Sequence, residues 1–187
     1  GYLNGYRIGD YEPDGYRDNP AFNRPRGFIE VTPEMVDLYV SPHFRLGQFL
    51  CKQESDWPKY VVLQERLLLK LERLLEEANA QGLRTDEFEI ISAYRTPWYN
   101  KSIGNDTPHS VHLYGGAADI RIGVTRQSPI GDLNRDGRTN ANDARVLYSL
   151  VEELSDETWY RPFIGGLGFY PNSRFIHVDV RGEKVRW

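Results

Sequence analysis

The stretch Ser110-Val-His-Leu-Tyr-Gly-Gly-Ala-Ala-Asp119 decides the fold of this 187-residue chain. It places His112 and Asp119 seven residues apart and separates them largely by small residues. A glycine turn can fold the two side chains back onto one point, which is what a three-ligand catalytic zinc site needs. The stretch therefore predicts a zinc site with His112 and Asp119 as two of its ligands.

The third zinc ligand has to come from another part of the chain, and His177 is the best candidate. It lies within 175–181 (FIHVDVR), where apolar and polar residues alternate. Because successive strand residues point to opposite faces, Ile176, Val178 and Val180 share one face and His177 lies on the other. We therefore predict a strand with one face in the core and the other in the zinc site.

These motifs resemble those of the zinc D-alanyl-D-alanine peptidases, which include murein endopeptidases and carboxypeptidases and share their fold with the hedgehog signalling domain. The resemblance is carried by the Ser-x-His-x-x-Gly-x-Ala-x-Asp pattern of 110–119, by Ser-Ala-Tyr-Arg at 92–95 and by His177. It extends from about Ser41 to Trp187. It implies an α+β fold in which an antiparallel sheet packs with helices and carries zinc on one face.

The resemblance also implies the organisation of the chain into parts. Residues 41–187 would form the peptidase domain, and residues 1–40 an irregular N-terminal extension packed on it. Residues 1–30 are rich in Gly, Tyr, Asn, Asp and Pro and lack helical periodicity, which indicates turns and irregular chain. A flexible tail is the alternative for this segment.

The activity that the resemblance implies is hydrolysis of peptide bonds in peptidoglycan stem peptides. In the family, the arginine that matches Arg95 contacts the substrate or its oxyanion. The carboxypeptidases of the family place a carboxylate base three residues before the last histidine, where this chain has Arg174. We predict Asp179 as the general base instead, since it shares a strand face with His177. A role in holding His177, or an ion pair with Arg181, is the alternative.

A second metal site is predicted in the loop 132–143. Oxygen-bearing side chains stand at positions 1, 3, 5, 9 and 12 of a calcium loop of the EF-hand type, with Gly137 at position 6. The predicted calcium ligands are Asp132, Asn134, Asp136, Arg138 through its backbone carbonyl, Asn140 and Asp143. Aspartate at the last position makes the loop resemble a single dockerin repeat, inserted at about 126–160. The alternative is an Asx-rich loop that caps the next helix without metal.

The remaining pattern predicts the scaffold. Leucines spaced by three and four residues predict a helix over 60–80 that ends at Gly82, with its charged residues, Lys70 included, on a solvated face. A short helix is expected within 41–49, strands at 87–93 and 117–122, a loop at 98–108, a helix at 141–154 and a hairpin at 165–181. His43, Cys51 and His109 are expected to be ordinary structural residues, although His109 could also bind substrate or carry a proton.

Composition narrows the function. A formal net charge of −4 argues against binding to nucleic acid or anionic membranes, and no apolar run is long enough to span a bilayer. No signal peptide is visible, so a periplasmic or secreted location follows from the substrate class alone. We expect a monomer. The alternative function is a non-catalytic cell-wall binding module stabilised by zinc and calcium, and the sequence leaves endopeptidase and carboxypeptidase activity equally open.

Overall fold

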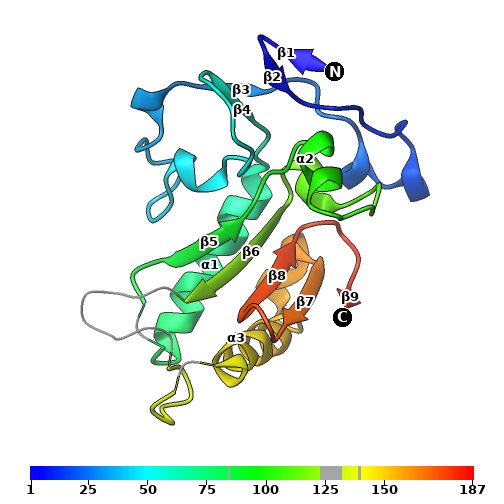
Figure 1. Ribbon diagram of the computed structural model, residues 1–187. Coiled ribbons are helices and arrows are strands. Elements are labelled where there is room, and N and C mark those ends of the chain that lie inside the picture. Colours follow the sequence, from blue (N-terminus) through cyan, green and yellow to red (C-terminus); the bar gives the residue numbers. More distant parts are fainter. Residues whose placement is uncertain (84, 123–131, 139) are drawn as a thin grey trace.

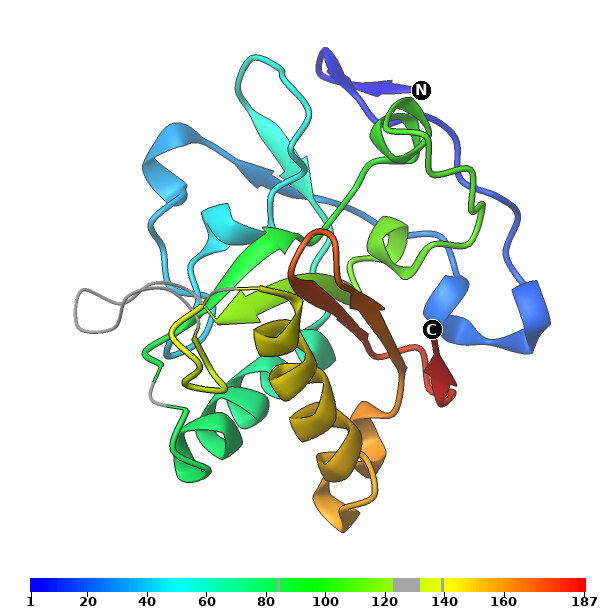
Figure 2. The ribbon, with the colours of Figure 1, turned by 60° about the horizontal axis from the view of Figure 1, so that its bottom comes forward.

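The computed structural model describes residues 1–83, 85–122, 132–138 and 140–187, and it shows a mixed α+β architecture (Figure 1). The two long helices are α1 (Glu65–Ala80) and α3 (Ala141–Leu154). Both lie on the same face of the main sheet (Figure 2). None of the helices in the described ranges is long and apolar enough to cross a membrane.

The main sheet has five strands in the order β5-β6-β8-β7-β9. Their bounds are Phe88–Ser92 for β5, Ala117–Ile122 for β6, Phe175–Asp179 for β8, Gly166–Tyr170 for β7 and Val185–Arg186 for β9. The first four strands pair antiparallel, as predicted. The short β9 was not predicted, and it pairs with β7 in parallel.

The core lies between this sheet and the two helices. Leu67, Leu71, Leu74 and Ala78 of α1 are fully buried, which confirms the predicted apolar stripe. Helix α1 begins later than predicted because Lys59–Val61 forms strand β4, paired with β3 (Ile29–Val31). At its other end the Leu83 N–H donates to the Ala78 carbonyl at 3.0 Å.

Two further predictions need correction. The segment 41–49 contains only a 3₁₀ turn, η4 (Leu46–Phe49), instead of a short α-helix. The predicted loop 98–108 begins with helix α2 (Pro97–Ser102), whose Thr96 hydroxyl accepts from the Tyr99 N–H at 3.1 Å. A threonine cap followed by proline at the first helical position was the signal for this helix.

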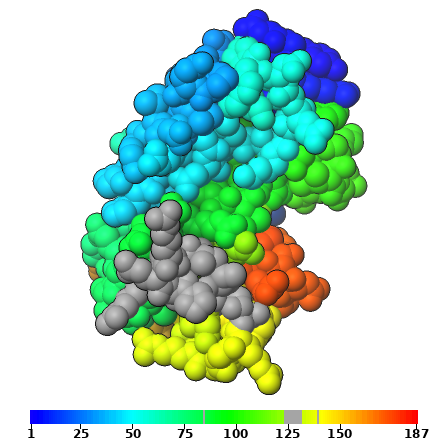
Figure 3. All heavy atoms as spheres, turned by 60° about the vertical axis from the view of Figure 1, so that its left-hand side comes forward, coloured from blue at the N-terminus to red at the C-terminus, as the bar shows by residue number. Residues whose placement is uncertain are grey.

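The N-terminal residues form short elements: the hairpin of β1 (Tyr2–Leu3) and β2 (Tyr6–Arg7), and the 3₁₀ turns η1 (Tyr16–Asp18), η2 (Pro20–Phe22) and η3 (Pro33–Met35). Tyr6 and Phe22 are buried. Figure 3 shows roughly the first third of the chain, blue to cyan, packed against the green residues that follow it. The division into an extension of 40 residues and a domain of 41–187 stays a prediction.

Gly115 turns the chain between the 3₁₀ turn η5 (Val111–Tyr114) and β6, with φ +68°. A Cβ at this position would lie 2.3 Å from the Val62 carbonyl oxygen. Gly104 has a similar φ of +78°, but nothing lies within 4 Å of its Cβ position. A comparison of alanine substitutions at the two glycines therefore separates the cost of backbone strain, which both positions share, from the cost of steric overlap, which only Gly115 has.

We predict that Gly115→Ala lowers the free energy of unfolding by roughly 3 kcal/mol or more, since the strain of a positive φ adds to the overlap with Val62. Gly104→Ala should cost only about 1 kcal/mol. Urea unfolding of both variants measures the difference. Equal losses would show that the chain relaxes around Val62 and that the close approach is not required.

Candidate metal centre

Strands β6 and β8 bring Asp119 and His177 opposite each other. The two residues are direct cross-strand partners, and His177 Nδ1 lies 3.0 Å from Asp119 Oδ1. The alternate residues of both strands, such as Ile120 and Ile176, are fully buried in the core. Burial on that face fixes the register, because a slip of one residue would turn both polar side chains into the apolar core.

The turn η5 supplies the third side chain. His112 Nε2 lies 3.2 Å from both Asp119 Oδ1 and His177 Nδ1. The other ring nitrogen, Nδ1, lies 2.6 Å from the Ala93 carbonyl oxygen and donates to it, because a carbonyl can only accept. The lone pair of Nε2 therefore points toward Asp119 and His177.

The three side chains together could hold a metal ion. His112, Asp119 and His177 are each at most 4% exposed, and one ligand atom from each lies within 4.8 Å of the others. Two imidazoles and a carboxylate are the donor set of catalytic zinc sites that keep a position open. The structure thus brings the three predicted ligands together, and their convergence fits a metal ion.

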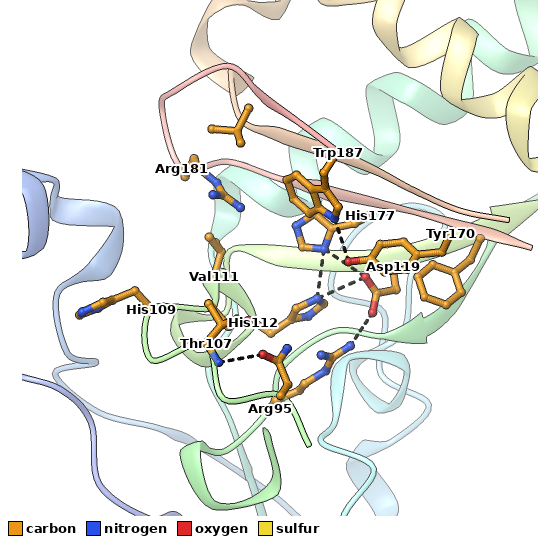
Figure 4. Close-up of a pocket in the computed structure, with 14 residues that line it drawn as sticks. Arg95, Thr107, His109, Val111, His112, Asp119, Tyr170, His177, Arg181 and Trp187 are labelled. Atoms are coloured by element: carbon orange, nitrogen blue, oxygen red, sulfur yellow. Dashed lines mark hydrogen bonds and ion pairs between the residues drawn. The ribbon is translucent and has the colours of Figure 1, made fainter. Parts of the chain in front are cut away.

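The group lies in a cavity of about 460 Å³ (Figure 4). Besides the three residues, the lining is Arg95, Asn105, Thr107, His109, Ser110, Val111, Tyr170, Phe175, Arg181, Val185 and Trp187. Most of the polar lining comes from the segment before His112. The aromatic lining comes from the β7–β8 hairpin and from Trp187.

Arg95 lies beside Asp119. Its Nη2 donates to Asp119 Oδ2 at 2.5 Å, and its Nε donates to Ser92 Oγ at 2.8 Å. Arg95 therefore fixes the outer oxygen of Asp119 and leaves Oδ1 toward the histidines. Its contact with a substrate oxyanion stays a prediction.

Asp179 lies behind the His177 ring. Its fully buried carboxylate bonds His177 Nε2 at 3.0 Å, whereas Nδ1 on the other side of the ring faces Asp119 and His112. Both oxygens of Asp179 also accept from Arg181, and Oδ1 accepts from the Gly166 N–H at 2.7 Å. This placement favours the alternative in which Asp179 holds His177 over the predicted role as general base.

Lys70 is a supporting residue that the sequence analysis placed wrongly on a solvated face. It is fully buried, and its Nζ donates to the backbone carbonyls of Asp179 at 2.7 Å and of Phe163 at 3.1 Å. Burial, only partly offset by Asp179, lowers the pKa of Lys70 to about 7. The signal was present, since Lys70 stands three residues after Leu67 and four before Leu74, on the apolar stripe.

The protonation states of the site follow from its contacts. Burial lowers the pKa of His112, which favours the neutral imidazole. Burial alone would raise the pKa of Asp119, but His112 and His177 hold it far below its usual range. Burial likewise opposes the charged form of His177, but the bonds to Asp119 and Asp179 outweigh it and raise its pKa.

The other residues singled out from the sequence lie outside this group. His109 stacks on Tyr16, with ring centroids 3.7 Å apart, and Figure 4 shows it pointing away from the three ligands. Arg174 is exposed in the turn between β7 and β8. His43 Nδ1 lies 2.6 Å from Glu72 Oε2, and Cys51 is buried.

The predicted calcium loop is folded around its own carboxylates. Asp132 accepts from the N–H groups of Asp136 at 2.9 Å and Gly137 at 2.8 Å. Asp143 accepts from the N–H groups of Leu133 and Asn140, each at 2.7 Å, and so joins the two ends of the loop. Residues 126–131 and 139 of the predicted insertion lie outside the described residues. Calcium binding stays a prediction.

The place of Trp187 in the cavity lining was missed by the sequence analysis. Trp187 donates from Nε1 to the Tyr170 hydroxyl at 2.9 Å, and its ring centroid lies 5.1 Å from that of His177. A Cβ on Gly168 would lie 2.5 Å from the indole, so the absence of a side chain lets the ring lie against β7. The Gly-Gly-Leu-Gly run at 165–168 was the available signal.

Comparison with known proteins adds no relative. No protein-family model matches the chain, and no curated protein matches it. The family resemblance therefore rests on the motif residues alone, and the activity it implies is a proposal.

We predict that Asp179→Asn weakens zinc binding by about 10- to 100-fold, because a neutral amide holds the His177 ring less firmly. Competition with a chromogenic chelator measures the zinc Kd. Glu89→Gln, which breaks the exposed pair with Arg121, is the matched control. An unchanged Kd together with lost hydrolysis would instead restore Asp179 as the general base.

Proposed function

We propose that the protein is a zinc metallopeptidase that hydrolyses peptide bonds in peptidoglycan stem peptides or their cross-links. The observation that carries this proposal is the convergence of buried His112 Nε2, Asp119 Oδ1 and His177 Nδ1 at a cavity of about 460 Å³. The peptidoglycan substrate comes from the motif resemblance. A periplasmic or secreted location follows from that substrate.

The architecture supports a domain of the hedgehog/D-alanyl-D-alanine peptidase type. Two neighbouring antiparallel strands, β6 and β8, present Asp119 and His177 on the face opposite α1 and α3. The His112 turn then closes onto that face from the side. This arrangement agrees with the expected sheet that packs with helices and carries the metal on one face.

Zinc bound at this site would supply a Lewis acid that polarises a peptide carbonyl and activates water. Among the protein's own residues, Arg95 pairs with Asp119. Its guanidinium group would be a second cation beside the zinc ion. Asp179 and Ala93 fix the two histidine rings from behind. His109, the remaining imidazole of the lining, stacks on Tyr16 and points away from the three ligands, so we assign no proton transfer to it.

The rival function is a non-catalytic binding module that keeps the metal. Arg174 at the expected position of the base and the engagement of Asp179 behind His177 favour this rival. The two functions differ in turnover and agree on metal binding, so one experiment separates them.

We predict one zinc per chain by elemental analysis of protein purified without added metal, and release of muropeptides from purified murein that a zinc chelator abolishes. Alanine at His112, Asp119 or His177 should abolish both zinc binding and hydrolysis, since each removes one of three protein ligands. His43→Ala is the matched control, because His43 pairs with Glu72 outside the cavity. Bound zinc without any cleavage would establish the binding module.

We further propose that the loop 132–143 binds calcium in a structural role. Asp132 and Asp136 lie in the loop that leads directly into α3, and Asp143 lies in the first turn of that helix. Calcium prefers oxygen ligands, and a bound cation would offset the negative charge of these carboxylates. Helix α3 packs on β7 and β8, so an ordered loop would stabilise the helix that supports the metal centre.

Calcium at 1 mM should raise the Tm of the zinc-loaded protein by several degrees, and the double variant Asp132→Ala/Asp136→Ala should lose this shift. Differential scanning calorimetry measures the effect. Asp156→Ala, an exposed acidic residue after α3, is the control and should keep it. A calcium-induced rise in Tm of the same size in the double variant would show that calcium binds outside the loop 132–143.

A further inference from the structure

We propose that Arg181 binds a carboxylate of the substrate beside the metal centre, so that the protein prefers peptides with a free carboxylate near the scissile bond. The inference rests on the proposed peptidase function and names a feature of its substrate. It concerns a residue for which the motif resemblance gives no role.

Arg181 and Arg95 flank the metal centre. Both line the cavity, and Figure 4 shows their side chains on opposite sides of the three predicted ligands. The Arg95 side chain is 12% exposed and that of Arg181 is 19% exposed. Each guanidinium group is therefore largely withdrawn from water but open to the cavity.

The Arg181 guanidinium is held in place from two sides. Its Nε and Nη2 donate to Asp179 Oδ2 at 2.9 and 2.5 Å, and its Cζ lies 5.5 Å from the Trp187 ring centroid. In the part of the chain that the structure describes, no hydrogen bond engages Nη1. Nη1 therefore keeps its donors for a ligand, and its orientation is fixed before binding.

The charges of the site favour an anionic ligand. Arg95 pairs with Asp119 and Arg181 with Asp179, so each arginine is balanced by one carboxylate. A divalent ion would leave two positive charges uncompensated, and Asp119 is the only acidic side chain among the described residues of the lining. A carboxylate on the substrate reduces this excess, and it accepts from a guanidinium in a charge-assisted hydrogen bond. A cationic substrate group would be repelled.

The position of Arg181 limits how far the bound carboxylate can lie from the bond that is cut. Asp179 Oδ2 contacts both His177 Nε2 at 3.0 Å and Arg181 Nη2 at 2.5 Å, so Arg181 is linked to His177 through one shared carboxylate oxygen. A chain residue spans at most about 3.6 Å. A carboxylate on Arg181 would thus lie within a few residues of a carbonyl at the metal. This fits a terminal residue and favours carboxypeptidase cleavage, which the sequence left open.

The test compares two ligands that differ only in charge, N-acetyl-D-alanine and N-acetyl-D-alaninamide, by isothermal titration calorimetry with the zinc-loaded full chain. We expect the wild-type protein to prefer the carboxylate, and Arg181→Gln to reduce this preference by roughly 10-fold or more. Any preference for the carboxylate that is due to zinc itself is the same in the wild-type protein and in Arg181→Gln, so it cancels when the two preferences are compared. Arg121→Gln, which breaks an exposed arginine–carboxylate pair of the same sheet, should keep the wild-type preference.

An Arg181→Gln protein with the wild-type preference would overturn the inference. If that variant holds less than one zinc per chain, Arg181→Lys is compared instead, since it keeps the charge beside Asp179 but loses the planar fork; an unchanged preference there would equally overturn it. Murein digestion is scored separately. A carboxylate preference without hydrolysis supports carboxylate binding by Arg181 and contradicts the proposed peptidase activity. Hydrolysis without the preference supports the peptidase activity and contradicts carboxylate binding by Arg181.

Discussion

The register between β6 and β8 is the constraint on which the rest of the structure depends. It places Asp119 directly opposite His177 and leaves the apolar residues of both strands in the core. The same pairing joins Ala117 to Asp179, so the residue that holds His177 is fixed by the same ladder. Two of the three side chains that could hold a metal ion thus come from strands of the main sheet, which position them more firmly than loops would.

A fully buried carboxylate behind the site adds a second constraint. Asp179 would destabilise the fold if its charge were unpaired, and the structure surrounds it with Arg181, His177 and the Gly166 N–H. Lys70 reaches its backbone carbonyl from α1 and thereby ties the helix layer to the end of β8. The position of His177 is thus coupled to the packing of the helix on the far side of the sheet.

The sequence predicted the parts of this arrangement that depend on local patterns. Alternation in 117–122 and 175–181 located both strands and their polar faces, and leucine spacing located α1, because each signal comes from residues a few positions apart. Lys70 and Trp187 owe their roles to contacts across the fold, with partners 109 and 17 residues away in the sequence. Asp179 was placed on the correct face, but only the structure shows on which side of the His177 ring it lies.

The N-terminal residues show why a short motif does not by itself build the site. Phe22 packs in one buried cluster with Val111, Leu113 and Tyr114, the neighbours of His112 in η5. The Tyr11 hydroxyl donates to the Leu113 carbonyl at 3.0 Å, and the Asn19 side chain donates to the Arg181 carbonyl at 2.9 Å. The extension therefore contacts the segments that carry His112 and Arg181. Because these contacts lie outside the motif, variation in residues 11–22 can change the geometry of the metal centre while all three predicted ligands stay the same.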